Sequence, residues 1–225
     1  MDMTQMNLFE QFIYYVQANG GYIFSQFWRH FLISIYGVLF ASVIGIPLGI
    51  LIARRRELSD WVIGIANVIS TIPSLAMMSI LMVGLGLGVN TVIVTVILYS
   101  LLPIIKNTYT GMINLDPGIL DAAKGLGMTN AQRLRMVEIP LAFSVIMAGV
   151  RNALVLAIGI ATIGAFIGAG GLGDIIIRGT NATDGGAIIL AGAIPTALMA
   201  IVVDLLLGWL QNKLYNSAAV KAAQQ

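Results

Sequence analysis

Residues 31–56 read FLISIYGVLFASVIGIPLGILIARRR, a run of 23 uncharged residues that three arginines close. A helix that crosses a membrane needs about 20 predominantly apolar residues, because the hydrocarbon layer is roughly 30 Å thick. Basic residues concentrate where a span meets the cytoplasmic surface. The stretch therefore predicts a transmembrane helix over Phe31–Ala53 that ends at the cytoplasmic side.

The composition of the whole chain agrees with a membrane location. Of its 225 residues, 58% are hydrophobic and 10% are charged, whereas about a quarter of the residues in soluble domains are charged. This excludes an ordinary soluble enzyme and a disordered protein. The chain has no cysteine and one histidine, His30, which excludes disulfides, thiol chemistry and a histidine metal cluster. The net charge of +2 gives no indication of a nucleic-acid partner.

Four further spans are expected along the chain. The 45 residues of Trp61–Ile105 carry no charge and are long enough for two spans, separated by a turn in the glycine-rich Gly84–Asn90. The predicted spans are Trp61–Val83, Thr91–Ile105, Phe143–Ile167 and Ala187–Leu210. The sequence thus predicts an all-α membrane protein with about five transmembrane helices, in a domain over residues 31–212.

The lysines and arginines predict how the chain is oriented in the membrane. One side would hold most of them, namely Arg54, Arg55, Arg56, Lys106, Lys124, Arg133, Arg135, Lys213 and Lys221. The other side would hold only Arg29 and Arg178. Because cytoplasmic loops carry the excess of basic residues, we expect the N-terminus outside and a cytoplasmic tail over residues 213–225.

The N-terminal segment, residues 1–30, is rich in aromatic and amide side chains. Its part from Leu8 to Trp28 indicates an interfacial helix on the outer face, with rings at the level of the lipid headgroups. A sixth span over the same residues is the alternative, and it would reverse the side of the N-terminus alone.

Residues 106–140, between the third and fourth spans, predict a compact helical element on the cytoplasmic side. Asp116 and Pro117 favour a helix start, since aspartate caps helices and proline suits the first helical position. Gly125 and Gly127 favour its end. Thr129 and Gln132 have the spacing of a capping box for a second helix, which would stop before Pro140. Such an exposed element suits docking of a soluble partner.

This element also carries a family resemblance. Asp121-Ala122-Ala123, three residues, Gly127, nine residues and Val137-Glu138-Ile139-Pro140 resemble the EAA loop of binding-protein-dependent ABC importer permeases, with Asp121 at the acidic position. The resemblance implies the fold of a type I ABC importer permease and a cytoplasmic coupling loop that contacts an ATPase. The residues that it implies for this coupling are Asp121, Ala122, Ala123, Gly127, Val137, Ile139 and Pro140.

Further stretches resemble the permeases of osmoprotectant importers for glycine betaine, carnitine and choline. They include Ser70–Leu75, Leu98–Gly111, Gly168–Asp174, Ile189–Pro195 and Asp204–Trp209. This implies a permease subunit, not an enzyme, in a bacterial plasma membrane. The implied partners are a cytoplasmic ATPase dimer that binds ATP and Mg, an extracellular substrate-binding protein and a second identical or similar permease chain. No cofactor is expected on this chain, which has no P-loop motif.

A quaternary ammonium ion favours aromatic faces and offers no hydrogen-bond donor. Side chains around the second and third spans are therefore candidates for the translocation path, namely Thr71, Pro73, Ser74, Tyr99 and Tyr109. Alternatives to this function are a permease for another small solute, such as methionine, and an ATP-independent channel or secondary transporter. The last would need intramembrane charges or an inverted repeat.

Three remaining features have plainer interpretations. Asp204 is expected to reach the cytoplasmic interface, and Arg151 to extend its side chain toward it. Gly168-x-Gly170-x-x-Gly173 matches a dinucleotide-binding fingerprint but follows a membrane span instead of a strand. We interpret it as a flexible loop entry on the outer side of the membrane.

Overall fold

A computed structural model describes the backbone of residues 7–223 and the side chains of residues 7–213. The predicted N-terminal segment therefore lies partly outside the described residues, at residues 1–6. Of the predicted C-terminal tail, residues 224–225 and the side chains from residue 214 onward, including that of Lys221, lie outside them. Over residues 7–223 the chain is helical and contains no strand, which confirms the predicted all-α class.

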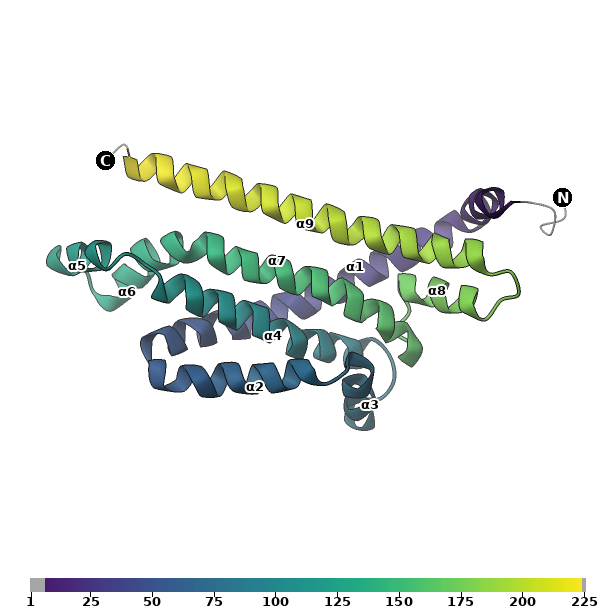
Figure 1. The fold of residues 1–225 in the computed structure, drawn as a ribbon, viewed down its shortest axis with the longest axis horizontal. Helices are drawn as coiled ribbons and strands as arrows, with labels where there is room; N and C mark the ends of the chain where they lie inside the picture. Colours follow the sequence, from purple (N-terminus) through teal and green to yellow (C-terminus); the bar gives the residue numbers. More distant parts are fainter. Residues whose placement is uncertain (1–6, 224–225) are drawn as a thin grey trace. The chain divides into compact units, whose positions relative to one another are not determined.

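The elements follow one another in a simple order (Figure 1). They are α1 (Leu8–Arg54), η2 (Arg56–Leu58), α2 (Ser59–Thr71), α3 (Ser74–Leu85), α4 (Val89–Ile113), α5 (Pro117–Gly125), α6 (Asn130–Arg133), η3 (Leu134–Glu138), α7 (Ile139–Ile163), η4 (Gly164–Ile167), α8 (Leu172–Thr180) and α9 (Gly186–Ala223).

Four stretches of helix within the described residues are long and apolar enough to cross a membrane. They are Leu8–Arg54, Val89–Ile113, Asn130–Ile167 and Gly186–Lys213. The pair α2 and α3 counts as a fifth span, or as a re-entrant loop, because it is bent at a short break. Each of the five predicted spans falls in one of these elements.

The second span differs from the continuous helix that the sequence predicts. Helix α2 ends at Thr71, and α3 begins at Ser74 after Pro73, whose backbone is extended at φ −56° and ψ 134°. Proline has no N–H to donate and disfavours a helical residue before it. The break inside Trp61–Val83 therefore has a local cause in Pro73.

No helix boundary separates the predicted interfacial helix from the predicted first span. Helix α1 runs through Trp28 and Phe31 without interruption, and its non-helical residue is Asn19, with φ −118° and ψ 17°. The Nδ2 atom of Asn19 donates to the carbonyl oxygen of Tyr15 at 3.1 Å, a local bond that competes with the helical pattern. The break therefore directly precedes Gly20 and Gly21 and lies well before the apolar run.

The chain divides into two compact units. Unit 1 comprises the described part of Met1–Leu39 together with Ile72–Ile97 and Leu154–Val202. Unit 2 comprises Phe40–Thr71, Leu98–Ala153 and the described part of Val203–Gln225. In unit 2, a core cluster of Met112, Ala142 and Ile146 packs against partly buried apolar residues of α1 and of the region before α7, among them Ile50 and Leu134.

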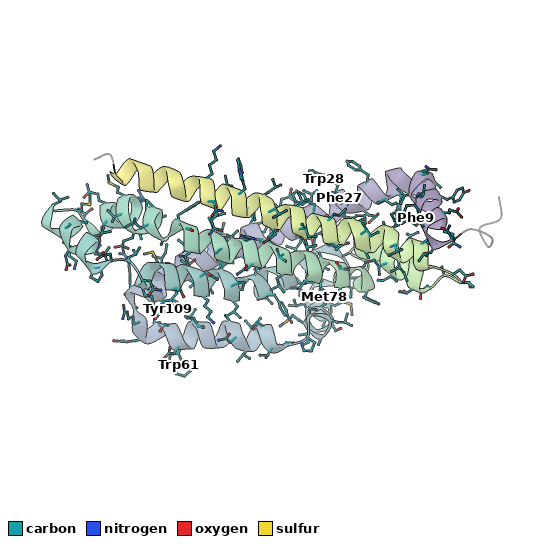
Figure 2. The ribbon with its side chains drawn as sticks, turned by 45° about the horizontal axis from the view of Figure 1, so that its top comes forward. Phe9, Phe27, Trp28, Trp61, Met78 and Tyr109 are labelled. Atoms are coloured by element: carbon teal, nitrogen blue, oxygen red, sulfur yellow. The ribbon has the colours of Figure 1, made fainter. Side chains whose placement is uncertain are left out.

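Many large apolar side chains remain exposed on the chain. Trp61 is 75% exposed and Val83 is 90% exposed, and Figure 2 shows Trp61 projecting from α2. A water-soluble monomer seldom carries so many exposed large apolar groups. The exposed surface is that of a chain surrounded by lipid and other apolar helices, as its composition predicts.

Close helix contact in unit 2 depends on Gly49. A Cβ atom at this position would lie 2.5 Å from Cβ of Thr108 and 3.0 Å from the carbonyl oxygen of Ile105, so α1 and α4 approach along a face without a side chain. We expect Gly49→Val to lower the free energy of unfolding in detergent micelles by about 1–3 kcal/mol through overpacking.

Gly64 is the matched control for this prediction, because a Cβ atom there would meet nothing within 4 Å. Gly64→Ala should leave the stability unchanged or raise it by up to about 1 kcal/mol, since alanine is the better helix former. Equal stability of Gly49→Val and the unmodified protein would contradict the packing argument.

Candidate functional site

The candidate coupling loop begins with a capped helix. Asp116 caps α5, and its Oδ1 atom accepts from the backbone N–H of Gly118 at 2.7 Å, with Pro117 at the first helical position. The helix ends at Gly125, and Gly127 follows in the left-handed region with φ 75°. The local structure predicted for this segment is confirmed.

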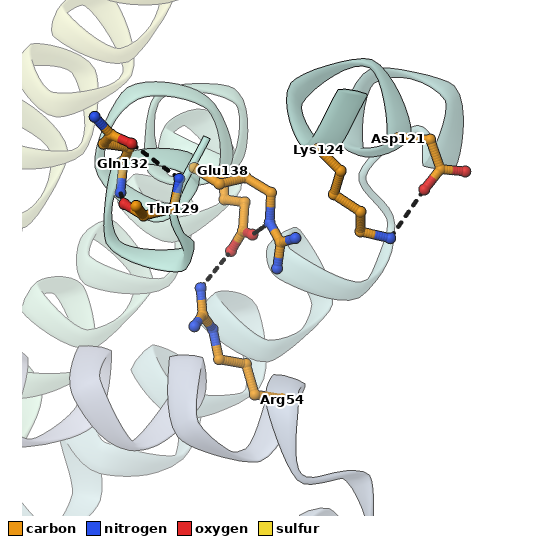
Figure 3. Close-up of polar contacts among 7 residues, drawn as sticks. Arg54, Asp121, Lys124, Thr129, Gln132 and Glu138 are labelled. Atoms are coloured by element: carbon orange, nitrogen blue, oxygen red, sulfur yellow. Dashed lines mark hydrogen bonds and ion pairs between the residues drawn. The ribbon is translucent and has the colours of Figure 1, made fainter. Parts of the chain in front are cut away.

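The second predicted helix start is confirmed as well. Thr129 and Gln132 form a capping box: the Gln132 N–H donates to Oγ1 of Thr129, and the Thr129 N–H donates to Oε1 of Gln132 at 2.9 Å (Figure 3). The box satisfies backbone donors that the start of a helix leaves without partners. It therefore orders the chain as it leaves the turn at Gly127.

The predicted coupling residues differ in their exposure. Asp121, Ala122 and Gly127 are exposed, whereas Ala123 is buried within unit 2. Lys124 donates to the carboxylate of Asp121 at 2.9 Å (Figure 3). Such a surface pair is weak, so either charge can pair with a partner protein instead. The loop thus presents an acidic residue, an alanine and a glycine to the surface, while Ala123 holds α5 in place.

The end of the motif has a different character. Val137 and Ile139 are half-buried and Pro140 is exposed, while Glu138 between them is buried. Leu126, between Gly125 and Gly127, is 79% exposed.

Glu138 joins the loop to the first span, a link that the sequence did not predict. Its Oε1 atom accepts from Nε of Arg133 at 2.6 Å, and its Oε2 atom accepts from Nη2 of Arg54 at 3.1 Å (Figure 3). The side chain of Glu138 is 7% exposed, against 37% for Arg54. A buried carboxylate requires such partners, so it links the loop to the end of α1.

The second helix of the loop was predicted to stop before Pro140, but the helical chain continues through this residue. Residues Leu134–Glu138 form a π-helical turn, in which the N–H of Ile139 donates to the carbonyl oxygen of Leu134, and α7 continues through Pro140. The wider turn accommodates a proline, which can neither donate to the preceding turn nor fit closely against it. Single π-helical turns often occur at functional sites.

The predicted path residues belong to both units and differ in exposure. Thr71 is exposed, and its hydroxyl donates to the carbonyl oxygen of Val68 at 2.7 Å. Pro73 is exposed, Ser74 and Tyr109 are half-buried, and Tyr99 is buried. Figure 2 shows where Tyr109 lies on α4. Their role in translocation stays a prediction.

The glycine-rich turn before α8 is tightly packed, which corrects its interpretation as a flexible loop entry. Gly168, Gly170 and Gly171 have φ between 72° and 80°. Ala169 and Leu172 are fully buried. Glycine accepts this left-handed backbone without strain, and here the turn allows the chain to fold back against α1 within unit 1.

His30 anchors this turn, a role that the sequence did not predict. The backbone N–H of Leu172 donates to Nδ1 of His30 at 3.2 Å, so Nε2 carries the hydrogen and donates to the carbonyl oxygen of Ile158 at 3.0 Å. Gln26 accepts from the N–H of Gly171 at 2.7 Å. One fully buried imidazole thus joins α1, α7 and the start of α8.

His30→Leu should destabilise unit 1. It would leave the N–H of Leu172 and the carbonyl group of Ile158 without these partners, and an unsatisfied buried polar group costs about 1–3 kcal/mol. The measurement is the free energy of unfolding in detergent micelles. Gln17→Ala, at an exposed position of the same helix, should change it by less than about 0.5 kcal/mol. Equal effects of both substitutions would contradict the anchoring role.

A polar cluster joins α1 to α8 nearby. The hydroxyl of Tyr22 donates to Oδ2 of Asp174 at 2.5 Å, Nε of Arg178 donates to the same oxygen at 2.7 Å, and the guanidinium lies 5.0 Å from the centre of the Tyr22 ring. Partial burial by itself raises the pKa of Asp174, but these hydrogen bonds and the charges of Arg178 and Arg29 outweigh it and lower the pKa.

Arg151 and Asp204 were interpreted as two independent interface residues, yet they form an ion pair between α7 and α9. The pair joins residues 53 positions apart and lies within unit 2. The sequence contains only a weak signal for it, namely that each of these two apolar segments carries one charge of opposite sign.

The fold and the exposed helical loop together are those of a transport permease. The chain belongs to the family of binding-protein-dependent transport system inner membrane components, whose model matches residues 45–215. It is therefore a multi-pass membrane component of a transport system.

Named relatives are similar over nearly the whole chain. The carnitine transport permease protein OpuCD of Listeria monocytogenes is 63% identical, and the match covers 93% of this chain and 94% of the relative. The glycine betaine/carnitine/choline transport system permease protein OpuCD of Bacillus subtilis is 63% identical, over 93% and 91%. The choline transport system permease protein OpuBD of the same organism is 62% identical, over 93% and 92%.

Solved structures support the fold. An inward-facing structure of the MetNI methionine ABC transporter matches with a TM-score of 0.75 at 21% identity, over 86% of this chain and 96% of that chain. An amino acid ABC transporter crystallised with histidines matches with a TM-score of 0.68 at 21% identity, over 90% and 98%. At this identity the likeness concerns the fold alone.

Proposed function

We propose that this chain is the membrane-spanning permease subunit of an ATP-driven importer for quaternary ammonium osmoprotectants such as glycine betaine, carnitine and choline. The observation that carries the proposal is the 62–63% identity, over 93% of the chain, to permeases whose names specify these three solutes. The methionine alternative is weaker, because the methionine transporter is similar at only 21% identity.

The coupling loop is the surface proposed to bind a cytoplasmic ATPase. Asp121, Ala122 and Gly127 are exposed on it, and Leu126 adds an apolar side chain next to the turn. An alanine and a glycine allow a partner to approach closely, and the Asp121 carboxylate can accept a charged hydrogen bond. Ala123, Val137, Ile139 and Pro140 would act indirectly, by holding the loop against unit 2.

The remaining partners follow from the same proposal. Two permease chains would enclose the path, two ATPase subunits would bind ATP and Mg, and a binding protein outside the cell would deliver the solute. The N-terminus would lie outside and the C-terminus in the cytoplasm, because the arginines and lysines concentrate at the loop and at the C-terminal ends of α1 and α9.

Coupling requires that ATP and the loaded binding protein favour one conformation of the permease over the other. Glu138 connects the loop to Arg54 at the end of α1. A displacement of the loop by the ATPase would therefore be transmitted to the first span through this ion pair. The path itself needs only weak contacts with the solute, since tight binding would slow its release.

The decisive experiment is uptake of labelled glycine betaine into liposomes that hold the permease, its ATPase and its binding protein. We expect accumulation that requires ATP on the ATPase side and that carnitine or choline reduces by competition. ATP hydrolysis without uptake of any of the three solutes would contradict the substrate class and leave the importer intact. Uptake by the permease alone, without ATP, would contradict the importer.

A further inference from the structure

The Arg151–Asp204 pair is a two-pronged ion pair between two candidate membrane spans. Nε of Arg151 donates to Oδ1 of Asp204, and Nη2 donates to Oδ2 at 2.5 Å. Arg151 lies well inside α7 (Ile139–Ile163), and Asp204 lies inside the apolar part of α9, Gly186–Lys213. Neither residue is at the end of its apolar segment, where an interface anchor would be expected.

The two charges are not sealed inside the chain. The side chain of Arg151 is 32% exposed and that of Asp204 is 37% exposed. Ionisable groups within membrane spans almost always face the interior of a bundle or a water-filled cavity, because contact with lipid is costly. The exposed edges of this pair therefore suit the wet passage of a permease.

The protein makes room for the guanidinium at one position of α9. A Cβ atom on Gly208, one helical turn after Asp204, would lie 2.8 Å from Nη1 of Arg151 and 3.1 Å from its Cζ. Arg151 thus lies against the bare backbone of α9, and its planar group is held beside the carboxylate. A planar, positioned guanidinium is suited to binding a carboxylate through two parallel hydrogen bonds.

We infer that Arg151 and Asp204 form a transient binding site for zwitterionic osmolytes, in which Arg151 binds the carboxylate and Asp204 faces the trimethylammonium group. This inference rests on the proposed function. A zwitterion replaces the internal pair with two new pairs and leaves the net charge of the site unchanged. A trimethylammonium group has no N–H, so it needs only the negative charge that Asp204 supplies.

Choline tests the inference, because it carries the same cation but no carboxylate. In uptake assays with saturating binding protein, Arg151→Gln should lower glycine betaine transport relative to choline transport by about tenfold, roughly one lost charged contact. Asp204→Asn should change the ratio in the opposite direction, because Arg151 without its partner repels the choline cation and still binds a carboxylate.

A purely structural ion pair predicts a different result. Both substitutions would then lower the transport of both solutes by the same factor, and the reversed pair Arg151→Asp with Asp204→Arg would restore both. Either outcome would overturn the inference. Arg178→Gln removes an arginine from α8 instead, and the ratio of the two transport rates should stay at its original value.

A binding measurement keeps this test separate from the proposed function. Saturation-transfer NMR on the purified permease–ATPase complex detects weak binding without transport. We expect glycine betaine signals with the unmodified complex and their loss in Arg151→Gln, and equal signals in both would overturn the inference. Failure of the unmodified system to transport any of the three solutes would contradict the proposed function, while the NMR result would still decide the site.

Discussion

Gly127→Pro should reduce ATP-driven uptake by at least about tenfold, equivalent to ~1.4 kcal/mol in the coupled step, while the chain still inserts into the membrane. Gly127 has φ 75° and its N–H donates to the carbonyl oxygen of Lys124 at 2.9 Å. Proline has φ near −65° and no N–H, so it can adopt neither feature. The turn between α5 and α6 would change, and with it the surface that we propose binds the ATPase.

A graded series makes this prediction specific. Gly127→Ala should have a smaller effect, since a left-handed backbone costs a residue with a Cβ atom about 1–2 kcal/mol. Gly125→Ala is the matched control, because a Cβ atom there meets nothing within 4 Å. The measurements are uptake and the amount of ATPase that co-purifies with the permease. Normal uptake by Gly127→Pro would contradict a coupling role for the turn.

Glu138→Ala should destabilise unit 2 by less than the about 3–5 kcal/mol that removing one partner of a fully buried ion pair costs, because the two guanidinium groups left behind are partly exposed. The substitution leaves the half-buried guanidinium of Arg133 without its carboxylate and separates the loop from Arg54. The side chain of Arg54 is 37% exposed, so solvent screens the charge that the substitution leaves there and reduces the loss of stability. The free energy of unfolding in detergent micelles is the direct measurement.

Two further variants distinguish the link from a general charge effect. Lys124→Ala removes an ion pair whose side chains are 59% and 71% exposed, so it should cost less than about 1 kcal/mol. Glu138→Gln keeps the shape and one acceptor oxygen, so it should retain more stability than Glu138→Ala and transmit less of the ATP-driven movement. A Glu138→Ala protein as stable as the unmodified protein would show that the pair does not hold the loop.

Features with local causes were predictable. The caps at Asp116 and Thr129 depend on side chains that bond to backbone groups two or three residues away, so neighbouring residues suffice to identify them. The left-handed turn at Gly127 and the apolar length of the spans are local in the same sense. The family resemblance of the loop likewise rested on residues close together in the sequence, from Asp121 to Pro140.

Other local features could be assigned only from the structure, because several residues could have ended or bent a helix. Asn19 breaks α1 although Gly20 and Gly21 follow it directly, and Pro73 breaks the second span. Pro140, in contrast, leaves its helix continuous because the π-helical turn of Leu134–Glu138 absorbs the strain. The same residue type thus has opposite outcomes that depend on the preceding turn.

The sequence by itself determined the membrane class, the places of the apolar spans, the capped helices of the loop and the family, because apolar length, capping and motif spacing are properties of short segments. Only the tertiary structure decided which charges meet. Glu138 with Arg54 and Arg151 with Asp204 are 84 and 53 residues apart, and His30 joins Ile158 and Leu172 across 128 and 142 residues. The packing of helices selects these partners, since a buried polar group must be satisfied by whichever group the fold places beside it.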